Sequence, residues 1–175
     1  METPMNSGMH EFLAQDRVIW GKPAAQAVLE EADRRAAKRV FIVTSRTLNR
    51  NTDAVEKIRN ALGGRCAGTF DECREHTPRP SVIAAAEAAR SADPDLVLTF
   101  GGGTAIDTVK VMLIALAHGV TRSEQLGDYH LRVNPDGSRH APAVKPPPFR
   151  QIVLSTTLSA AEFSDFGGCT DPVRK

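Results

Sequence analysis

Two uninterrupted apolar runs place the strongest constraint on the fold of this 175-residue chain. They read RVFIVT at residues 39–44 and DLVLTF at residues 95–100, without the polar alternation of a strand that faces water on one side. Such runs are typical of strands buried on both faces of a parallel sheet. Alanine-rich stretches lie between the runs, so the sequence predicts an α/β fold, with a Rossmann-like, mostly parallel sheet flanked by helices.

The same alternation predicts the remaining elements. Weaker strands are expected at residues 17–20, 65–70, 150–155 and 167–170. Helices are expected at residues 23–35, 52–62, 81–91 and 104–117, with Asp53 capping the second and His118 closing the last. Residues 121–149 are polar and proline-rich, and a loop of this length is usually a lid, an insertion or disorder. We treat it as an insertion in one domain that spans residues 1–175.

Composition limits the classes of partner. The 22 basic and 21 acidic residues leave a net charge of +1, which would recruit neither nucleic acid nor an anionic membrane. No apolar run approaches the ~20 residues that span a bilayer, and residues 1–10 lack the order of a signal peptide. We therefore expect a cytoplasmic protein that binds small molecules or other proteins. Three cysteines without CxxC spacing fit reduced thiols: Cys66, Cys73 and Cys169.

The segment at residues 98–110 carries the most functional information. A buried strand runs directly into Gly101, Gly102 and Gly103, and a helix is expected to begin at Thr104. Glycines let backbone N–H groups approach a ligand, and a helix N-terminus adds unpaired N–H groups and a partial positive charge. The turn therefore predicts an anion site, most naturally for a pyrophosphate. A purely structural interpretation also stands, because Thr104 and Asp107 have capping-box spacing.

The glycine pattern separates this turn from better-known phosphate loops. It is not GxxxxGK[ST], which disfavours a P-loop, and it is not the GxGxxG turn that opens an ordinary Rossmann fold. Small-molecule kinases also use strand–GGxG–helix turns. Those turns usually carry an aspartate among the glycines, and residues 101–103 contain none, so we disfavour a kinase.

A second cluster of polar residues follows the strand expected at residues 150–155. Its hydroxyls belong to Ser155, Thr156, Thr157 and Ser159. Ligands of open α/β sheets bind beyond the carboxyl ends of the strands. We therefore expect the strand ends at Ser45, Gly101 and Thr156 to meet at one edge. A turn rich in serine and threonine, without a ligand, is the structural alternative.

Together these segments resemble the iron-containing (group III) alcohol dehydrogenase family, which has the dehydroquinate synthase-like fold. The family motif GGGSxxDxxK is matched by GGGTAIDTVK at residues 101–110, and the TTxxxxE segment by TTLSAAE at residues 156–162. A TD pair follows at residues 170–171, and residues 43–48 and 76–78 look like two further family loops. The spacing of the TT segment is most similar to the maleylacetate reductase branch. The resemblance covers nearly the whole chain outside residues 121–149.

The resemblance implies a role for each matching residue. Asp107 would lie towards the nicotinamide and the substrate, and Lys110 would support the helix of the motif. The residues implied to bind the cofactor are Gly101, Gly102, Gly103 and Thr104 at the pyrophosphate, and Thr156, Thr157 and Ser159 along the adenosine and ribose.

One departure from the family concerns the choice between NAD and NADP. Members that prefer NAD carry an aspartate after the first buried strand, and this chain has Ser45 there, followed by Arg46. Loss of the carboxylate removes a hydrogen bond to the ribose 2′-hydroxyl and its repulsion of a 2′-phosphate, with which Arg46 can pair. We expect an NAD(P) site at which NADP(H) is accepted or preferred.

Metal ligands are the other departure. Family members hold Fe²⁺ or Zn²⁺ with one aspartate and three histidines of a helical C-terminal domain, and this sequence has no such set. Its histidines lack HxxxH spacing and are expected in loops or at the surface: His10, His76, His118, His130 and His140. We therefore expect the C-terminal domain to be missing from this chain and the metal to bind only in a full-length protein.

The leading hypothesis is thus the cofactor-binding half of an NAD(P)-dependent oxidoreductase, inactive by itself. Its substrate would be an alcohol, aldehyde or keto acid, and the resemblance allows for a homodimer. The alternative is a stand-alone nucleotide-binding or regulatory module without catalysis.

Overall fold

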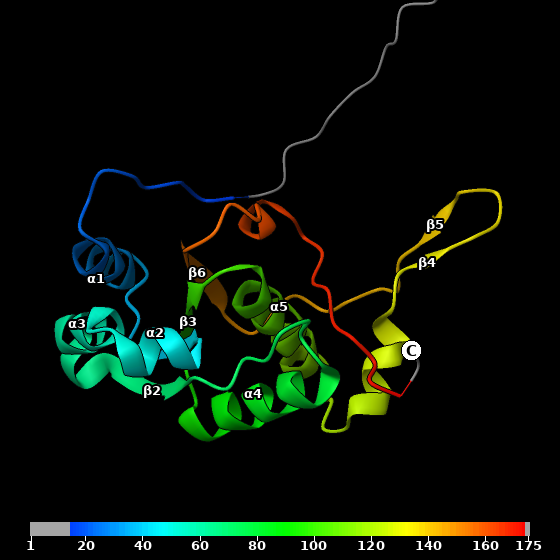
Figure 1. The fold of residues 1–175 in the computed structure, drawn as a ribbon, viewed down its shortest axis with the longest axis horizontal. Helices are drawn as coiled ribbons and strands as arrows, with labels where there is room; N and C mark the ends of the chain where they lie inside the picture. Colours follow the sequence, from blue (N-terminus) through cyan, green and yellow to red (C-terminus); the bar gives the residue numbers. More distant parts are fainter. Residues whose placement is uncertain (1–14, 174–175) are drawn as a thin grey trace, which may run out of the picture.

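The computed structural model describes residues 15–173, and within them four parallel strands form one sheet (Figure 1). The sheet order is β2-β1-β3-β6. The strands are β1 (Val40–Thr44), β2 (Cys66–Phe70), β3 (Leu96–Gly101) and β6 (Arg150–Ser155). The expectation of an α/β fold with a mostly parallel sheet is confirmed, and the strands expected at 39–44, 65–70, 95–100 and 150–155 are all present within a residue.

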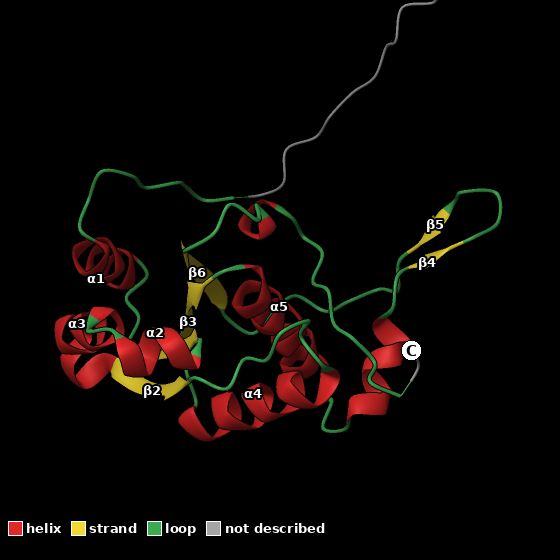
Figure 2. Cartoon of the chain, in the orientation of Figure 1, coloured by secondary structure: helices red, strands yellow, loops and turns green. Residues whose placement is uncertain are grey.

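Helices cover both faces of this sheet, as Figure 2 shows. One face carries α1 (Ala24–Arg34) and α3 (Ala54–Leu62). The short helix α2 (Arg46–Asn51) comes directly before α3 in the chain. The other face carries α4 (Arg79–Ala92) and α5 (Gly103–His118), which pack against each other. Single-turn 3₁₀ helices follow α3 and β6, as η1 (Gly63–Arg65) and η3 (Ala161–Phe163).

The apolar core lies in two layers, one on each side of the sheet. Successive side chains of a strand point to opposite faces, so Ile42 packs towards α1 and α3 while Val43 packs towards α4 and α5. Leu98 and Val97 of β3 divide in the same way. All five residues of β1 are buried, which explains why this strand reads as an uninterrupted apolar run.

The order of the strands creates a switch point between β1 and β3. From β1 the chain moves through α2 and α3 to β2 on one side, then returns through α4 to β3 on the other side. The connecting helices lie on opposite faces of the sheet, and open α/β sheets generally bind ligands beyond the carboxyl ends of the strands at such a point. Ser45 and Gly101 lie at those two ends.

Two expected strands are wrong. Residues 17–20 form no strand, and Val18, Ile19 and Trp20 are exposed, because none of the described strands pairs with them. Residues 167–170 form only one bridge, between Pro78 and Thr170, because this segment crosses α5 instead of joining the sheet. The local sequence of a short segment does not show whether another strand is available for it to pair with.

The helix starts also differ in detail from expectation. Asp53 occupies the N-cap position of α3 without a side-chain capping bond, and pairs instead with Lys57 at 2.8 Å. The helix α2 was not expected. Its N-cap is Ser45, whose hydroxyl accepts a hydrogen bond from the N–H of Leu48 at 3.2 Å.

Residues 121–149 contain more structure than their composition suggests. They hold the 3₁₀ helix η2 (Ser123–Tyr129) and a hairpin of β4 (Arg132–Val133) and β5 (Arg139–His140) that projects from the body of the molecule (Figure 1). The hairpin turn is closed by Asn134, whose carbonyl accepts from the N–H of Gly137, a glycine with φ of 82°. A positive φ of this size favours glycine.

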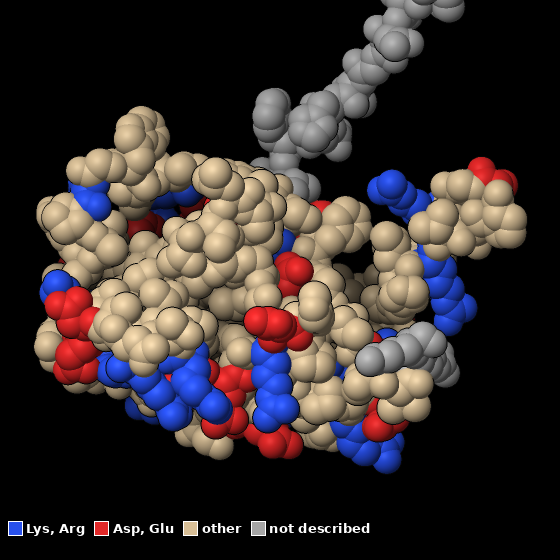
Figure 3. Space-filling view, in the orientation of Figure 1, with Lys and Arg blue, Asp and Glu red and all other residues tan. Residues whose placement is uncertain are grey.

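The surface carries both signs of charge. On the face shown in Figure 3, acidic and basic side chains lie side by side along the lower part. Within residues 15–173 no single helix is long and apolar enough to cross a membrane; only α5 and η2 together reach that length, and they are bent by 93°. Residues 1–10, for which the sequence predicts no signal peptide, lie outside the described residues.

Candidate functional site

The glycine turn joins β3 to α5. Gly101 ends the strand, Gly102 is the N-cap with extended backbone angles, and Gly103 is the first helical residue. The N–H groups of the first helical turn have no acceptor within the helix and carry its partial positive charge. Gly102, Gly103 and Thr104 are partly exposed, so this end of α5 can be reached by a ligand.

The capping-box interpretation of Thr104 and Asp107 is wrong. Thr104 lies inside the helix, and α5 has no side-chain cap. The carboxylate of Asp107 instead accepts a hydrogen bond from the backbone N–H of Gly168. Burial raises the pKa of Asp107 above its ordinary value, while that hydrogen bond and the Lys110 charge act in the opposite direction.

Close packing leaves little room for a side chain at the three glycines. A Cβ atom at Gly101 would lie 2.9 Å from the Cβ of Ala105, and one at Gly102 would lie 2.7 Å from Cγ2 and 2.8 Å from Oγ1 of Thr157. A Cβ at Gly103 would meet Ser159 at 3.3 Å. The side chains of the hydroxyl loop, which we define as residues 156–166, therefore lie directly against the turn, and two of the three glycines face hydroxyl-bearing side chains.

The sheet register brings the three strand ends together. Thr44 of β1 pairs with Phe100, and Gly101 pairs with Ser155 of β6. The buried hydroxyl of Thr44 donates to the Phe100 carbonyl at 2.7 Å, and the N–H of Thr156 donates to the Gly101 carbonyl at 3.1 Å. Helix N-terminus, glycines and hydroxyls thus lie at one edge of the sheet.

At the end of β1, Ser45 caps α2 and Arg46 begins it. Nη2 of Arg46 lies 3.6 Å from Oε1 of Glu72, and both side chains are more than half exposed. Glu72 follows β2 and forms an isolated bridge with Ser45. The sequence analysis did not identify this carboxylate. Two acidic residues, Asp71 and Glu72, follow β2, but only the sheet order shows that β2 lies next to β1.

Lys110 contacts the hydroxyl loop with its ammonium. Nζ donates to the carbonyl oxygens of Ala161 at 2.5 Å, Ser164 at 2.6 Å and Phe166 at 2.7 Å. Burial lowers the pKa of Lys110, and the nearby Asp107 carboxylate is the strongest influence that raises it. The family resemblance implies that Lys110 supports its own helix; it does not predict these contacts with a different segment.

A groove of about 900 Å³ lies beside this site. It runs along β6 and the segment at residues 15–19, and Phe100, Lys110 and Glu162 contribute to its walls. The glycines at 101–103 are not among its lining residues, so the groove is next to the turn rather than over it.

Comparison with known proteins identifies the family of this chain. The family described as "Iron-containing alcohol dehydrogenase" matches residues 15–175. The chain belongs to the iron-containing alcohol dehydrogenase family. The resemblance inferred from the glycine turn and the TT segment is therefore confirmed.

Individual relatives show which branches of the iron-containing alcohol dehydrogenases are similar. Dehydrogenase FUM7 of Gibberella moniliformis is 32% identical over 156 residues, which is 88% of this chain and 37% of that protein. Maleylacetate reductase 2 of Cupriavidus pinatubonensis is 33% identical over 66% of this chain and 32% of its own length. The chain thus spans about a third of the length of these relatives.

A solved structure supports the fold. Sulfoacetaldehyde reductase from Bifidobacterium kashiwanohense, in complex with NAD⁺, superposes with a TM-score of 0.62 at 22% identity, covering 78% of this chain and 33% of that one.

The family name raises the question of metal ligands. Residues 15–173 contain no group of three or more His, Cys, Asp and Glu side chains placed to hold a metal ion. His118 instead packs against Tyr129 with ring centroids 4.5 Å apart, and its Nε2 accepts from the N–H of Lys145 at 2.8 Å. His10 lies outside the described residues. The described residues therefore do not fit the family's iron. The cysteines in this part of the chain are free thiols.

Proposed function

We propose that this chain binds the pyrophosphate of NAD(P) at the glycine turn, as the cofactor-binding half of an alcohol dehydrogenase or maleylacetate reductase-like oxidoreductase. The observation that carries the proposal is the N-terminus of α5 meeting the hydroxyl loop at the β1–β3 switch point. Helix N–H groups and hydroxyls are donors suited to phosphate oxygens. The NAD⁺ complex of the related sulfoacetaldehyde reductase supports the same class of ligand.

The residue roles follow from position. The backbone N–H groups at Gly102, Gly103 and Thr104 would donate to the bridging phosphates, and Gly101 keeps the turn narrow. The hydroxyl loop would line the adenosine and ribose with Thr156, Thr157 and Ser159. The side chains of Thr157 and Ser159 lie against Gly102 and Gly103, so their hydroxyls would also lie near the phosphates. Asp107 would lie on the nicotinamide and substrate side, where it holds Gly168 in place.

The choice between the two dinucleotides would depend on the end of β1. Ser45 offers no carboxylate to a ribose 2′-hydroxyl, and Arg46 is exposed enough to pair with a 2′-phosphate. We therefore propose that NADP(H) is accepted or preferred. Arg46 must then leave Glu72, which costs little because exposed ion pairs are weak.

The whole enzyme would transfer hydride between the nicotinamide and an alcohol, aldehyde or keto acid. A divalent metal, Fe²⁺ or Zn²⁺, would polarise the substrate oxygen when bound. We propose that its ligands belong to a C-terminal domain outside these 175 residues, because residues 15–173 contain no suitable group. The chain alone would then bind dinucleotide without turnover. We further propose a cytoplasmic protein that forms homodimers and binds neither nucleic acid nor membranes.

A stand-alone nucleotide-binding or regulatory module is the second candidate, and the same lack of a metal-binding group favours it. The two candidates predict different behaviour for a longer protein that also contains the proposed C-terminal domain. An assay of that protein with added Fe²⁺ or Zn²⁺ separates them, because only the oxidoreductase turns over.

Titration of the 175-residue chain with NADH and NADPH, followed by the fluorescence of the dihydronicotinamide, tests the binding proposal. We expect saturable binding of both cofactors and no oxidation of alcohols with either metal. No dinucleotide affinity in a folded sample would contradict the binding proposal. Metal-dependent turnover by these 175 residues would contradict the proposed division between two domains.

A further inference from the structure

The ammonium of Lys110 uses all of its hydrogen-bonding capacity on one loop. An ammonium has three donors and no acceptor, and each donor reaches a different backbone carbonyl: Ala161, Ser164 and Phe166. The three oxygens lie within 2.7 Å of Nζ. Ala161 is the first residue of the single-turn 3₁₀ helix η3, and Ser164 is its C-cap, so the cation contacts both ends of that turn and fixes the path of the chain around it.

The hydroxyl loop has few other anchors. After Ser155 the chain leaves the sheet, and residues 155–160 are exposed. Ala160 has a positive φ of 56°, a conformation that an alanine rarely adopts without external contacts. The N–H of Thr156 bonds to Gly101, and Nε2 of Gln15 donates to the Glu162 carbonyl at 3.0 Å. The other side-chain bonds, such as Ser155 Oγ to the Thr157 carbonyl at 2.9 Å, are local. The Lys110 ammonium, with three bonds, thus makes more long-range hydrogen bonds to this loop than Gln15 or Gly101, which make one each.

Lys110 and the glycine turn belong to the same helix. α5 begins at Gly103, and Asp107 and Lys110 lie one and two turns further along it. Lys110 holds the hydroxyl loop, and Asp107 holds Gly168 two residues beyond its end. Both residues therefore connect this part of the chain to the helix whose N-terminus would face the ligand. A shift of the loop relative to α5 would move Thr157 and Ser159 away from Gly102 and Gly103.

We propose that Lys110 is a positioning residue for the dinucleotide site, which holds the hydroxyl loop at the distance from the glycine turn that lets the Thr157 hydroxyl reach a bound pyrophosphate. This inference rests on the proposed function for its ligand, and adds a residue that acts through the loop without touching the cofactor. It predicts that the effect of Lys110 on binding depends on the Thr157 hydroxyl.

The test is a double-mutant cycle on NADH affinity. Lys110→Met keeps the length of the side chain and removes its three donors; Thr157→Val keeps the shape of the threonine and removes its hydroxyl. We expect Lys110→Met to raise the NADH dissociation constant about tenfold in the wild-type background and by no more than about twofold in the Thr157→Val background. Lys57→Met, which removes an exposed ammonium on α3, is the matched control and should leave affinity unchanged.

Three outcomes would count against the proposal. Wild-type affinity in a folded Lys110→Met variant overturns it, and so does an equal loss in both backgrounds, which would indicate a structural role independent of the hydroxyl. A wild-type chain that binds no NADH overturns the proposed function together with this inference, so the two failures are distinguishable. If Lys110→Met does not fold, Lys110→Gln replaces it in the same cycle; its amide keeps two donors, and we expect an intermediate loss of affinity that again depends on the Thr157 hydroxyl.

Discussion

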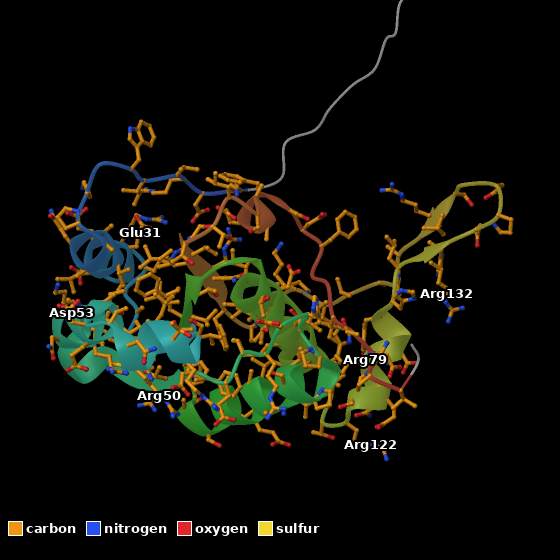
Figure 4. The ribbon with its side chains drawn as sticks, in the orientation of Figure 1. Glu31, Arg50, Asp53, Arg79, Arg122 and Arg132 are labelled. Carbon is orange, nitrogen blue, oxygen red and sulfur yellow. The ribbon has the colours of Figure 1, made fainter. Side chains whose placement is uncertain are left out.

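Nη1 of Arg79 lies 2.7 Å from Oδ2 of Asp171 and joins the first turn of α4 to a segment 92 residues further along the chain. The side chains are only 13% and 20% exposed. The backbone repeats this connection, because the N–H of Arg79 donates to the Thr170 carbonyl and the N–H of Thr170 donates to the Thr77 carbonyl. The guanidinium of Arg79 (Figure 4) therefore helps to hold the last described segment on the body of the domain.

We expect Arg79→Met to lower the free energy of unfolding by about 1–3 kcal/mol, because it leaves the largely buried Asp171 carboxylate without its guanidinium. Urea denaturation followed by circular dichroism measures the change. Asp53→Asn is the control; it breaks an ion pair with Lys57 in which both side chains are more than 60% exposed, and should have no measurable effect. Equal stability of the two variants would show that the Arg79 pair contributes nothing.

Gly102→Ala tests the close approach of the hydroxyl loop to the turn. The new methyl group would lie 2.7 Å from Cγ2 of Thr157, so the Thr157 side chain or the exposed loop that carries it must shift. We expect at least about tenfold weaker dinucleotide binding, from the displaced hydroxyls and the altered N-cap, with a small change in melting temperature. Gly64→Ala has open space around its new methyl group and should bind as the wild type does, with stability equal or higher by up to about 1 kcal/mol. A Gly102→Ala variant with wild-type affinity would place the cofactor elsewhere.

Cys73 provides a prediction on pH. Burial raises the pKa of its thiol from 9.0 to about 11. A raised pKa means that the folded state holds the proton more tightly than the unfolded state, so stability is unaffected below pH 9 and falls as the pH rises towards 11. The loss should reach at most about 2–3 kcal/mol, since one pKa unit corresponds to about 1.4 kcal/mol.

Two measurements check the behaviour of Cys73. In a variant with Cys66 and Cys169 replaced by serine, iodoacetamide at pH 8 should alkylate the native protein far more slowly than the urea-unfolded protein. Replacing Cys73 by alanine should reduce the fall in stability between pH 9 and 11. Equal alkylation rates in the native and unfolded states would contradict the burial of this thiol.

The elements that the sequence predicted well are those with a local cause. The uninterrupted run of β1 reports burial on both faces, and the glycines of residues 101–103 report a tight strand-to-helix turn. The elements it predicted wrongly depend on partners far along the chain. Ile19 has a β-branched side chain but no described strand to pair with, and Asp107 meets the N–H of Gly168 instead of capping its own helix.

In the candidate site, too, the sequence predicts features with a local cause and misses contacts between distant segments. The shared edge of the strand ends followed from the parallel sheet, because its geometry places all carboxyl ends on one side. The contact between Thr157 and Gly102, the three carbonyls around Lys110 and the carboxylate of Glu72 beside Arg46 did not. These contacts depend on the path of the hydroxyl loop and on the order of the strands. The spacing of residues within a short stretch of sequence predicts neither.

The last prediction concerns the preference between NADPH and NADH, which we expect Arg46 and Glu72 to determine. Arg46→Ala removes the cation available to a 2′-phosphate, and we expect about tenfold weaker NADPH binding with little change for NADH. Glu72→Gln frees Arg46 from its carboxylate partner and should strengthen NADPH binding, whereas Ser45→Asp restores a carboxylate at the end of β1 and should favour NADH. Arg50→Ala is the control, because Arg50 (Figure 4) is an equally exposed arginine of α2 that pairs with Asp71 instead. Fluorescence titration of each variant with both dinucleotides supplies the ratio of dissociation constants, and at least about tenfold tighter NADH binding by the wild-type chain would refute the proposed acceptance of NADP(H).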